Sequence, residues 1–187
     1  MKICKKTIFN TPVLSSCLRF LCRFSMWISG WKIEGKIPNQ QSCVLIAIPH
    51  TSNWDFPITL AMFSLCQWDV HWLGKKEMFT FPLKHFFCWL GGIPVDRSES
   101  NELVTQASNL YKENADLMLM VTPEGTRKKV LKWKTGFYYI ALKASVPIFL
   151  GNLDYSRKVA RILGVFTPTG EYEKDLAEIK NYYAGFL

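Results

Sequence analysis

A histidine and an aspartate stand just after one of the most apolar stretches of the chain. His50 follows the run Val44-Leu45-Ile46-Ala47-Ile48 and one proline, and Asp55 comes five residues later. On a regular helix, five positions at about 100° each would turn these two side chains to different sides. They can meet if His50 lies in a turn and Asp55 in the first turn of a following helix. Pro57 agrees with this arrangement, because proline is tolerated in a first helical turn.

Such a pair can do acid–base chemistry. Asp55 could accept a hydrogen bond from one imidazole nitrogen of His50 and leave the other nitrogen available as a base. The alternative is structural, since an aspartate at a helix start is a common cap and Ser52-x-x-Asp55 resembles a capping box. The spacing of the pair leaves both interpretations open.

Two further stretches offer groups that could bind an anion or orient a hydroxyl. Arg97 ends the stretch Gly91-Gly-Ile-Pro-Val-Asp-Arg97, and the planar guanidinium suits bidentate contact with a phosphate. In Pro123-Glu-Gly-Thr-Arg127, Glu124 could orient a hydroxyl and Arg127 could hold an anion. The structural alternatives are a surface ion pair for Arg97 and an ordinary Pro-Gly turn at 123–127.

A third stretch, Gly74-Lys-Lys-Glu77, places Lys75 and Lys76 after a short apolar segment. These lysines could bind a phosphate, or they could be a solvated pair of charges.

These residues need a framework, and the apolar pattern predicts one. We expect strands over residues 44–48, 70–73, 92–95, 117–121, 147–153 and 160–165, and helices over 56–66, 82–90, 99–113, 135–144 and 172–183. The alternation predicts a single α/β domain with a mixed, mostly parallel sheet covered by helices. Sites in such sheets lie at the carboxyl ends of strands, and His50, Arg97 and Glu124 each follow a predicted strand.

The N-terminal segment is amphipathic and basic. Apolar residues recur at helical spacing from Leu14 to Ile28, with Arg19 and Arg23 on another side. Residues 1–36 hold seven lysines and arginines against one glutamate, in a chain of net charge +8. We interpret residues 1–32 as a segment that lies on a membrane surface, and residues 33–187 as the catalytic domain. The alternative is a helix that packs on the protein's own core.

Composition excludes several other classes of protein. The charge is concentrated at one end and no nucleic-acid-binding module is present, which argues against a nucleic-acid partner. The six cysteines form no Cys-x-x-Cys pair, and the three histidines have no metal-ligand spacing with them. We therefore expect no metal site, and we expect buried free thiols. No uninterrupted apolar run reaches the roughly 20 residues that cross a bilayer.

Taken together, the motifs resemble the glycerolipid (lysophosphatidic acid) acyltransferase superfamily. His50-Thr-Ser-Asn-Trp-Asp55 is similar to its His-x-x-x-x-Asp block, Gly92–Arg97 to its second block and Pro123–Arg127 to its third. Val146-Pro-Ile148 resembles the start of the fourth block, which here continues as Phe-Leu-Gly-Asn152 and lacks the usual second proline. The order and spacing agree from about residue 30 to about residue 167.

The resemblance implies acyl transfer from an acyl-CoA or acyl carrier protein thioester to a hydroxyl of a lysophospholipid such as 1-acylglycerol-3-phosphate. His50 would be the general base held by Asp55, with no cofactor beyond the thioester co-substrate. The substrate-binding residues implied are Lys76, Arg97, Glu124, Gly125, Thr126 and Arg127. We further expect attachment to anionic lipids on the cytoplasmic face of a membrane, as a peripheral or monotopic protein. Two alternatives remain: a thioesterase or lipid hydrolase with water as acceptor, and a non-catalytic membrane-surface protein.

Overall fold

The chain folds around a single seven-stranded sheet. The computed structural model describes residues 3–35, 38, 42–49, 52–96, 100–125 and 133–186. The strands follow one another across the sheet in the order β1-β7-β6-β2-β5-β3-β4. Their bounds are β1 Lys32–Glu34, β2 Cys43–Ile48, β3 Val70–Lys75, β4 Gly92–Val95, β5 Met118–Met120, β6 Ile148–Asp154 and β7 Val159–Phe166.

Five neighbouring strands run in the same direction. Strand β2 pairs in parallel with β6 and β5, and β3 pairs in parallel with β5 and β4. Strand β7 is antiparallel to β6, and β1 is parallel to β7. The carboxyl ends of β6, β2, β5, β3 and β4 therefore share one edge of the sheet.

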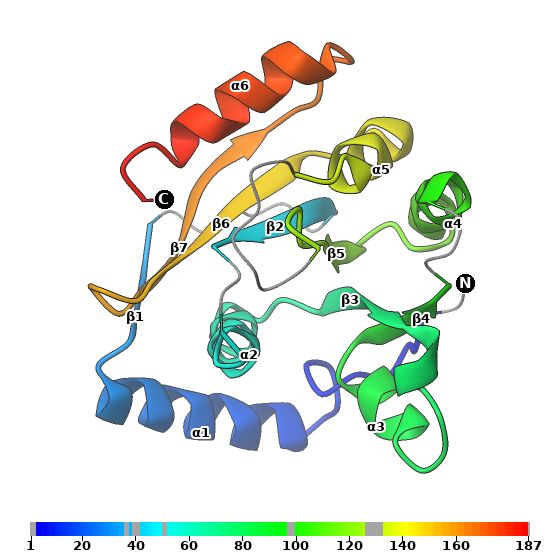
Figure 1. Cartoon of the computed structure of the whole chain (residues 1–187). Coiled ribbons are helices and arrows are strands. Elements are labelled where there is room, and N and C mark those ends of the chain that lie inside the picture. Colours follow the sequence, from blue (N-terminus) through cyan, green and yellow to red (C-terminus); the bar gives the residue numbers. More distant parts are fainter. Residues whose placement is uncertain are drawn as a thin grey trace.

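Helices cover both faces of the sheet (Figure 1). Helices α1, α2 and α3 lie on one face, and α4, α5 and α6 lie on the other. Their bounds are α1 Leu14–Ser29, α2 Asp55–Cys66, α3 Lys84–Trp89, α4 Ser100–Glu113, α5 Gly136–Ala144 and α6 Tyr172–Tyr182, and a short 3₁₀ helix, η1, spans Lys76–Met78.

Strand β2 shows why its sequence is apolar without alternation. Val44, Ile46 and Ile48 belong to the core on the α4–α6 face. Cys43 and Leu45 belong to the core on the α2 face. A parallel strand covered on both faces needs apolar side chains on both, and in β2 every residue except Ala47 is fully buried. This strand ends just before Pro49 and His50.

The predicted fold class is confirmed, and each predicted helix and strand is present with its ends moved by at most two residues. Strand β1 was not predicted. Its three residues, Lys-Ile-Glu, are too few to show an alternating pattern, and they form a strand through pairing with β7.

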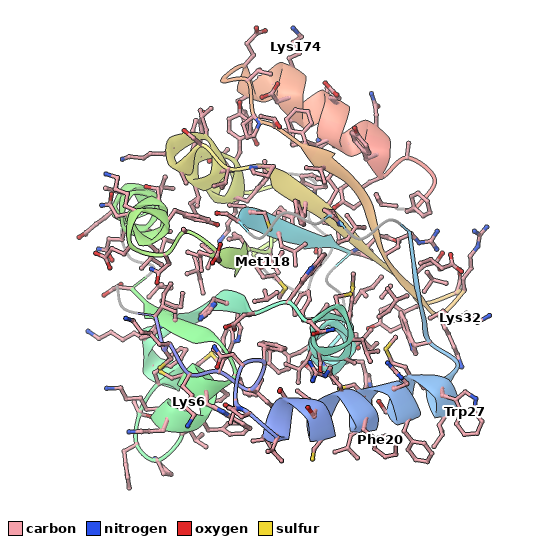
Figure 2. The ribbon with its side chains drawn as sticks, turned by 180° about the vertical axis from the view of Figure 1, so that it is seen from behind. Lys6, Phe20, Trp27, Lys32, Met118 and Lys174 are labelled. Carbon is pink, nitrogen blue, oxygen red and sulfur yellow. The ribbon has the colours of Figure 1, made fainter. Side chains whose placement is uncertain are left out.

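Helix α1 has two apolar faces, of which one packs on the protein's own core and the other is exposed; membrane contact through the exposed face stays a prediction. Cys22 and Met26 are buried and cluster with Ala61 of α2. Phe20 and Trp27 are exposed at 72% and 76% and point away from the molecule (Figure 2). Within the part of the chain that the structure describes, no helix is long and apolar enough to cross a membrane.

All six cysteines are free. Cys22 and Cys43 are buried as expected. Burial raises the pKa of the Cys22 thiol, and a hydrogen bond with Ser64 offsets part of this rise. Cys17 is exposed, so the expectation of burial is wrong for it, and Cys4, Cys66 and Cys88 are only partly buried. Cys17 lies on α1 in the same helical sector as Phe20 and Phe24, away from the face that packs on α2.

Candidate active site

The candidate groups follow strands whose carboxyl ends meet at one edge. Pro49 and the turn to Asp55 follow β2, Glu124 follows β5, Lys76 follows β3 and Asp96 follows β4. Because these strands are neighbours and parallel, the segments that leave them stand side by side. Sequence analysis expected Glu124 to follow a strand and Lys76 to follow a short apolar segment, and both residues lie at this edge.

Four of the predicted site residues lie outside the described residues: His50, Arg97, Thr126 and Arg127. Their roles remain predictions. The described residues that flank them are Pro49 and Ser52, Asp96 and Ser100, and Gly125 and Trp133.

Asp55 begins helix α2 and is buried, with only 4% of its surface exposed. Its Oδ2 accepts a hydrogen bond of 3.0 Å from the backbone N–H of Ser52. The Ser52 Oγ in turn accepts from the backbone N–H of Trp54 at 3.1 Å. This exchange resembles a capping box placed in the turn itself. Asp55 can cap the helix and also orient His50, because the contacts of the cap hold its carboxylate in a fixed place.

Tyr155 also holds the Asp55 carboxylate in place. Its hydroxyl donates to Asp55 Oδ1 from the turn between β6 and β7. Burial, the hydrogen bond to Asp55 and the charge of that carboxylate raise the pKa of Tyr155 to about 12. The hydroxyl therefore keeps its proton and remains a donor at neutral pH. The ring of Trp31 packs edge-on against it, with centroids 5.2 Å apart.

Asn152 holds the backbone just before His50. It lies beside Ile48 in the register of β6 and β2, and its Nδ2 donates to the Ile48 carbonyl oxygen at 3.0 Å. Asn152 is buried. It ends the Phe-Leu-Gly-Asn continuation in which the sequence departs from the family's fourth block.

The sequence alone did not indicate a role for Tyr155 or Asn152. They lie about a hundred residues from the residues they contact, so local spacing carried no signal for them. Strand pairing is what brings them to the site, because β6 runs beside β2 and delivers Asn152 and then Tyr155 to the same edge.

Glu124 and Gly125 lie in a tight turn after β5. Glu124 is buried, with 8% of its surface exposed, and it is not without an interaction partner. Gly125 has a φ of +61°, and a Cβ there would come within 2.7 Å of Lys134 Cε. The turn is closed by the backbone N–H of Lys134, which donates to the Pro123 carbonyl oxygen at 2.8 Å. Glycine suits this position for two reasons. It adopts the positive φ without strain, and it leaves room for the Lys134 side chain that lies over it.

Lys76 begins η1, directly after β3, and its side chain is exposed. The Lys76 ammonium makes no hydrogen bond or ion pair with any side chain or backbone group of the described residues. The structure thus leaves a cation at the same edge as Asp55 and Glu124, on the far side of β5 from β2.

The fold and the site together define an α/β protein with a buried, hydrogen-bonded carboxylate at the carboxyl edge of its sheet. A solved structure with this fold is that of the 1-acyl-sn-glycerophosphate (LPA) acyltransferase PlsC from Thermotoga maritima. The TM-score is 0.64, with 19% sequence identity, over 92% of this chain and 78% of that one.

Sequence comparison is more specific. The family model described as acyltransferase matches residues 31–149. The chain is 32% identical over 128 residues to a 1-acyl-sn-glycerol-3-phosphate acyltransferase of Haemophilus influenzae, covering 64% of this chain and 52% of the relative. It is 31% identical over 131 residues to an enzyme of the same name from Streptococcus pneumoniae, covering 66% and 48%.

The chain belongs to the acyltransferase family, whose model covers more than half of it. It spans about half the length of the curated relatives it matches.

Proposed function

We propose that this chain transfers a fatty acyl group from an acyl thioester to a hydroxyl of a lysophospholipid, such as 1-acylglycerol-3-phosphate. The donor would be acyl-CoA or acyl carrier protein. The observation that carries the proposal is the buried Asp55 carboxylate, held by Ser52 and Tyr155 in the turn that follows His50. The name shared by the curated relatives supports the acceptor class.

In the proposed step, one nitrogen of His50 takes the proton from the acceptor hydroxyl. The acceptor oxygen then forms a bond to the thioester carbonyl carbon, the carbon–sulfur bond breaks and the sulfur leaves as a thiolate. A thiol has a pKa of about 8.5, so this leaving group needs little acid assistance. The step is balanced without an acyl-enzyme, and it calls for no metal or cofactor.

Asp55 would fix the tautomer and direction of the imidazole. A carboxylate offers about four acceptor positions. Asp55 can therefore accept from Ser52, from Tyr155 and from a ring N–H of His50 at once. Its burial strengthens these contacts, because little water competes for the carboxylate.

The acceptor phosphate would be bound by Lys76, Arg97 and Arg127, and Glu124, Gly125 and Thr126 would shape the pocket around the acceptor. Lys76 supports this assignment, because it is an exposed cation at the edge where the carboxylate stands. The acceptor lies in a bilayer, so the protein would act as a peripheral or monotopic protein on the cytoplasmic face of a membrane. The basic segment 1–36 would hold it on anionic lipids.

The proposal is tested by product analysis. Purified protein is given acyl-CoA or acyl carrier protein donors with a panel of lysolipids that differ in headgroup, and the products are read by mass spectrometry. We expect a diacyl product from a phosphate-bearing lysolipid. A protein that forms no diacyl lipid from any donor and acceptor, while it remains folded, would show that the proposal is wrong.

Replacing Arg97 separates anion binding from chemistry. Arg97→Ala should raise the apparent KM for a phosphate-bearing acceptor by roughly 10- to 100-fold, the value of a charged hydrogen-bonded contact, with kcat little changed. Arg97→Lys should restore this only in part, because an ammonium lacks the planar fork. Steady-state kinetics with lysophosphatidate and with monoacylglycerol provide the check. An equal loss with monoacylglycerol would mean that Arg97 does not bind the phosphate.

Replacing Tyr155 tests how the carboxylate is held. In Tyr155→Phe the ring keeps its contact with Trp31, but Asp55 loses one donor. We expect kcat to fall roughly 10- to 100-fold, the value of one hydrogen bond to a charged group, with little change in the KM for the donor. The carboxylate would then interact more strongly with the imidazole and favour its protonated form, so the acid limb of the kcat/KM profile should move to higher pH.

Tyr139→Phe, on helix α5, is the matched control for this change, because it removes a tyrosine hydroxyl from the other face of the sheet. A Tyr155→Phe enzyme that loses thermal stability yet keeps the wild-type pH profile would assign Tyr155 a purely structural role.

A further inference from the structure

A group of apolar side chains projects from the turn before α3 and from α3 itself. Phe81 is exposed at 93%, Leu83 at 51% and Phe86 at 50%. Single apolar residues are common on protein surfaces, whereas several that lie together mark an interaction site. We call residues 81–86 the α3 patch.

Packing on the inner side of this segment holds the α3 patch exposed. On its inner side, Phe79 is buried and the rings of Phe79 and Phe87 pack against Trp72, with centroids 5.9 and 6.3 Å away. The indole N–H of Trp72 donates to the Leu90 carbonyl oxygen at 2.9 Å. These contacts anchor both ends of the segment, so Phe81, Leu83 and Phe86 face outward on a fixed support.

The α3 patch is joined to the segment that leads into α1. The backbone N–H of Ile8 donates to the Trp89 carbonyl oxygen at 2.8 Å, and the Trp89 indole donates to Thr11 Oγ1 at 3.3 Å. Helices α1 and α3 lie along the same edge of the molecule (Figure 1), the edge from which Phe20 and Trp27 point outward (Figure 2). One flat surface can therefore meet both.

The charged side chains that these two segments themselves carry are all basic. Residues 3–29 and residues 79–89 contain no aspartate or glutamate. The basic side chains of the two segments are Lys5, Lys6, Arg19, Arg23 and Lys84. Apolar and aromatic side chains combined with basic ones, without acidic ones, match an interface of acyl chains beneath anionic headgroups.

We propose that the α3 patch is a second membrane contact, which acts together with α1 to seat the protein on a bilayer that contains anionic lipids. Phe81, Leu83 and Phe86 enter the boundary between headgroups and acyl chains, and Lys84 meets the lipid phosphates. The inference rests on the proposed function, whose acceptor is a membrane lipid. Contact through α1 alone would leave the protein able to rotate about that helix, and the second contact fixes the tilt of the sheet relative to the membrane.

The test compares exposed-residue variants of the full chain in vesicle flotation, with phosphatidylcholine vesicles that do or do not contain phosphatidylglycerol. Phe81→Ser/Leu83→Ser alters the α3 patch, and Phe24→Ser/Trp27→Ser alters α1. Tyr182→Ser on α6, at the opposite side of the molecule, is the matched control. We expect the α3 variant to lower the partition coefficient on anionic vesicles roughly tenfold, as the loss of two partly buried apolar side chains implies. The control should bind like wild type.

Activity in detergent micelles separates this inference from the proposed function. The α3 variant should keep wild-type turnover on micelles and lose it on vesicles. Wild-type vesicle binding by a folded Phe81→Ser/Leu83→Ser protein, alongside weak binding by the α1 variant, would overturn the second contact and leave the proposed function standing. Lack of turnover by wild type on micelles and vesicles alike would count against the proposed function instead.

Discussion

His50→Ala should lower kcat for acyl transfer by roughly 10²- to 10⁴-fold, the usual contribution of a general base. The loss should appear in kcat more than in the KM of either substrate, because the imidazole is proposed to act as the acceptor hydroxyl attacks. It is measured by steady-state kinetics with a thioester donor and a phosphate-bearing lysolipid.

The matched control is His85→Ala, which removes an exposed histidine from α3. In detergent micelles this variant should turn over like wild type. A folded His50→Ala protein with turnover close to that of wild type would rule out His50 as the base.

Asp55→Asn should impair transfer almost as strongly, by about 10²- to 10⁴-fold, while the fold stays intact. The amide oxygen can still accept the N–H of Ser52, and the amide nitrogen can face Tyr155, whose hydroxyl can turn to accept. The shape of the site is thus kept and the negative charge is lost. Without that charge the imidazole loses its orienting acceptor and the partner that stabilises its protonated form.

Asp69→Asn is a matched control for this loss of charge. Its carboxylate is also hydrogen-bonded, to Thr7 and Asn10 at 2.7 Å each, but it lies before the start of β3, away from the carboxyl edge. Thermal unfolding and kinetics of both variants decide the matter. If Asp55→Asn loses stability in proportion to its activity, Asp55 is chiefly a helix cap. If it keeps its stability and loses its activity, the carboxylate serves the reaction.

Those parts of the fold that depend on local pattern could be predicted from the sequence. Strand β2 is apolar at every position because helices cover both of its faces, and that run is visible in the sequence. That Glu124 and Lys76 lie at the same edge of the sheet as the Asp55 turn follows from a general rule about parallel sheets.

The parts that depend on long-range pairing could not be predicted. Tyr155 lies in a polar turn between two strands, where nothing in the local sequence indicates that its hydroxyl contacts a distant carboxylate. In the sequence, Asn152 is a single polar residue within an apolar strand, and nothing local indicates its contact with Ile48. Both acquire their roles only when β6 pairs with β2, because that register brings Asn152 to Ile48 and the next turn to Asp55.

Helix α1 shows a second limit of pattern analysis. Leu18, Cys22 and Met26 share one face by spacing, and Leu21, Phe24 and Ile28 share another. Spacing alone does not say which set packs inward. In the structure α2 supplies the apolar surface that buries Cys22 and Met26, and the other set is left facing outward.

The measurement that tests the central claim most directly is thiol release from an acyl-CoA donor, with and without 1-acylglycerol-3-phosphate, followed together with free fatty acid and diacyl product. The account predicts that thiol release depends on the lysolipid and equals the diacyl product formed. Thiol released at the same rate without lysolipid, with an equal amount of free fatty acid, would contradict it, because water would then be the acceptor and the protein a thioesterase.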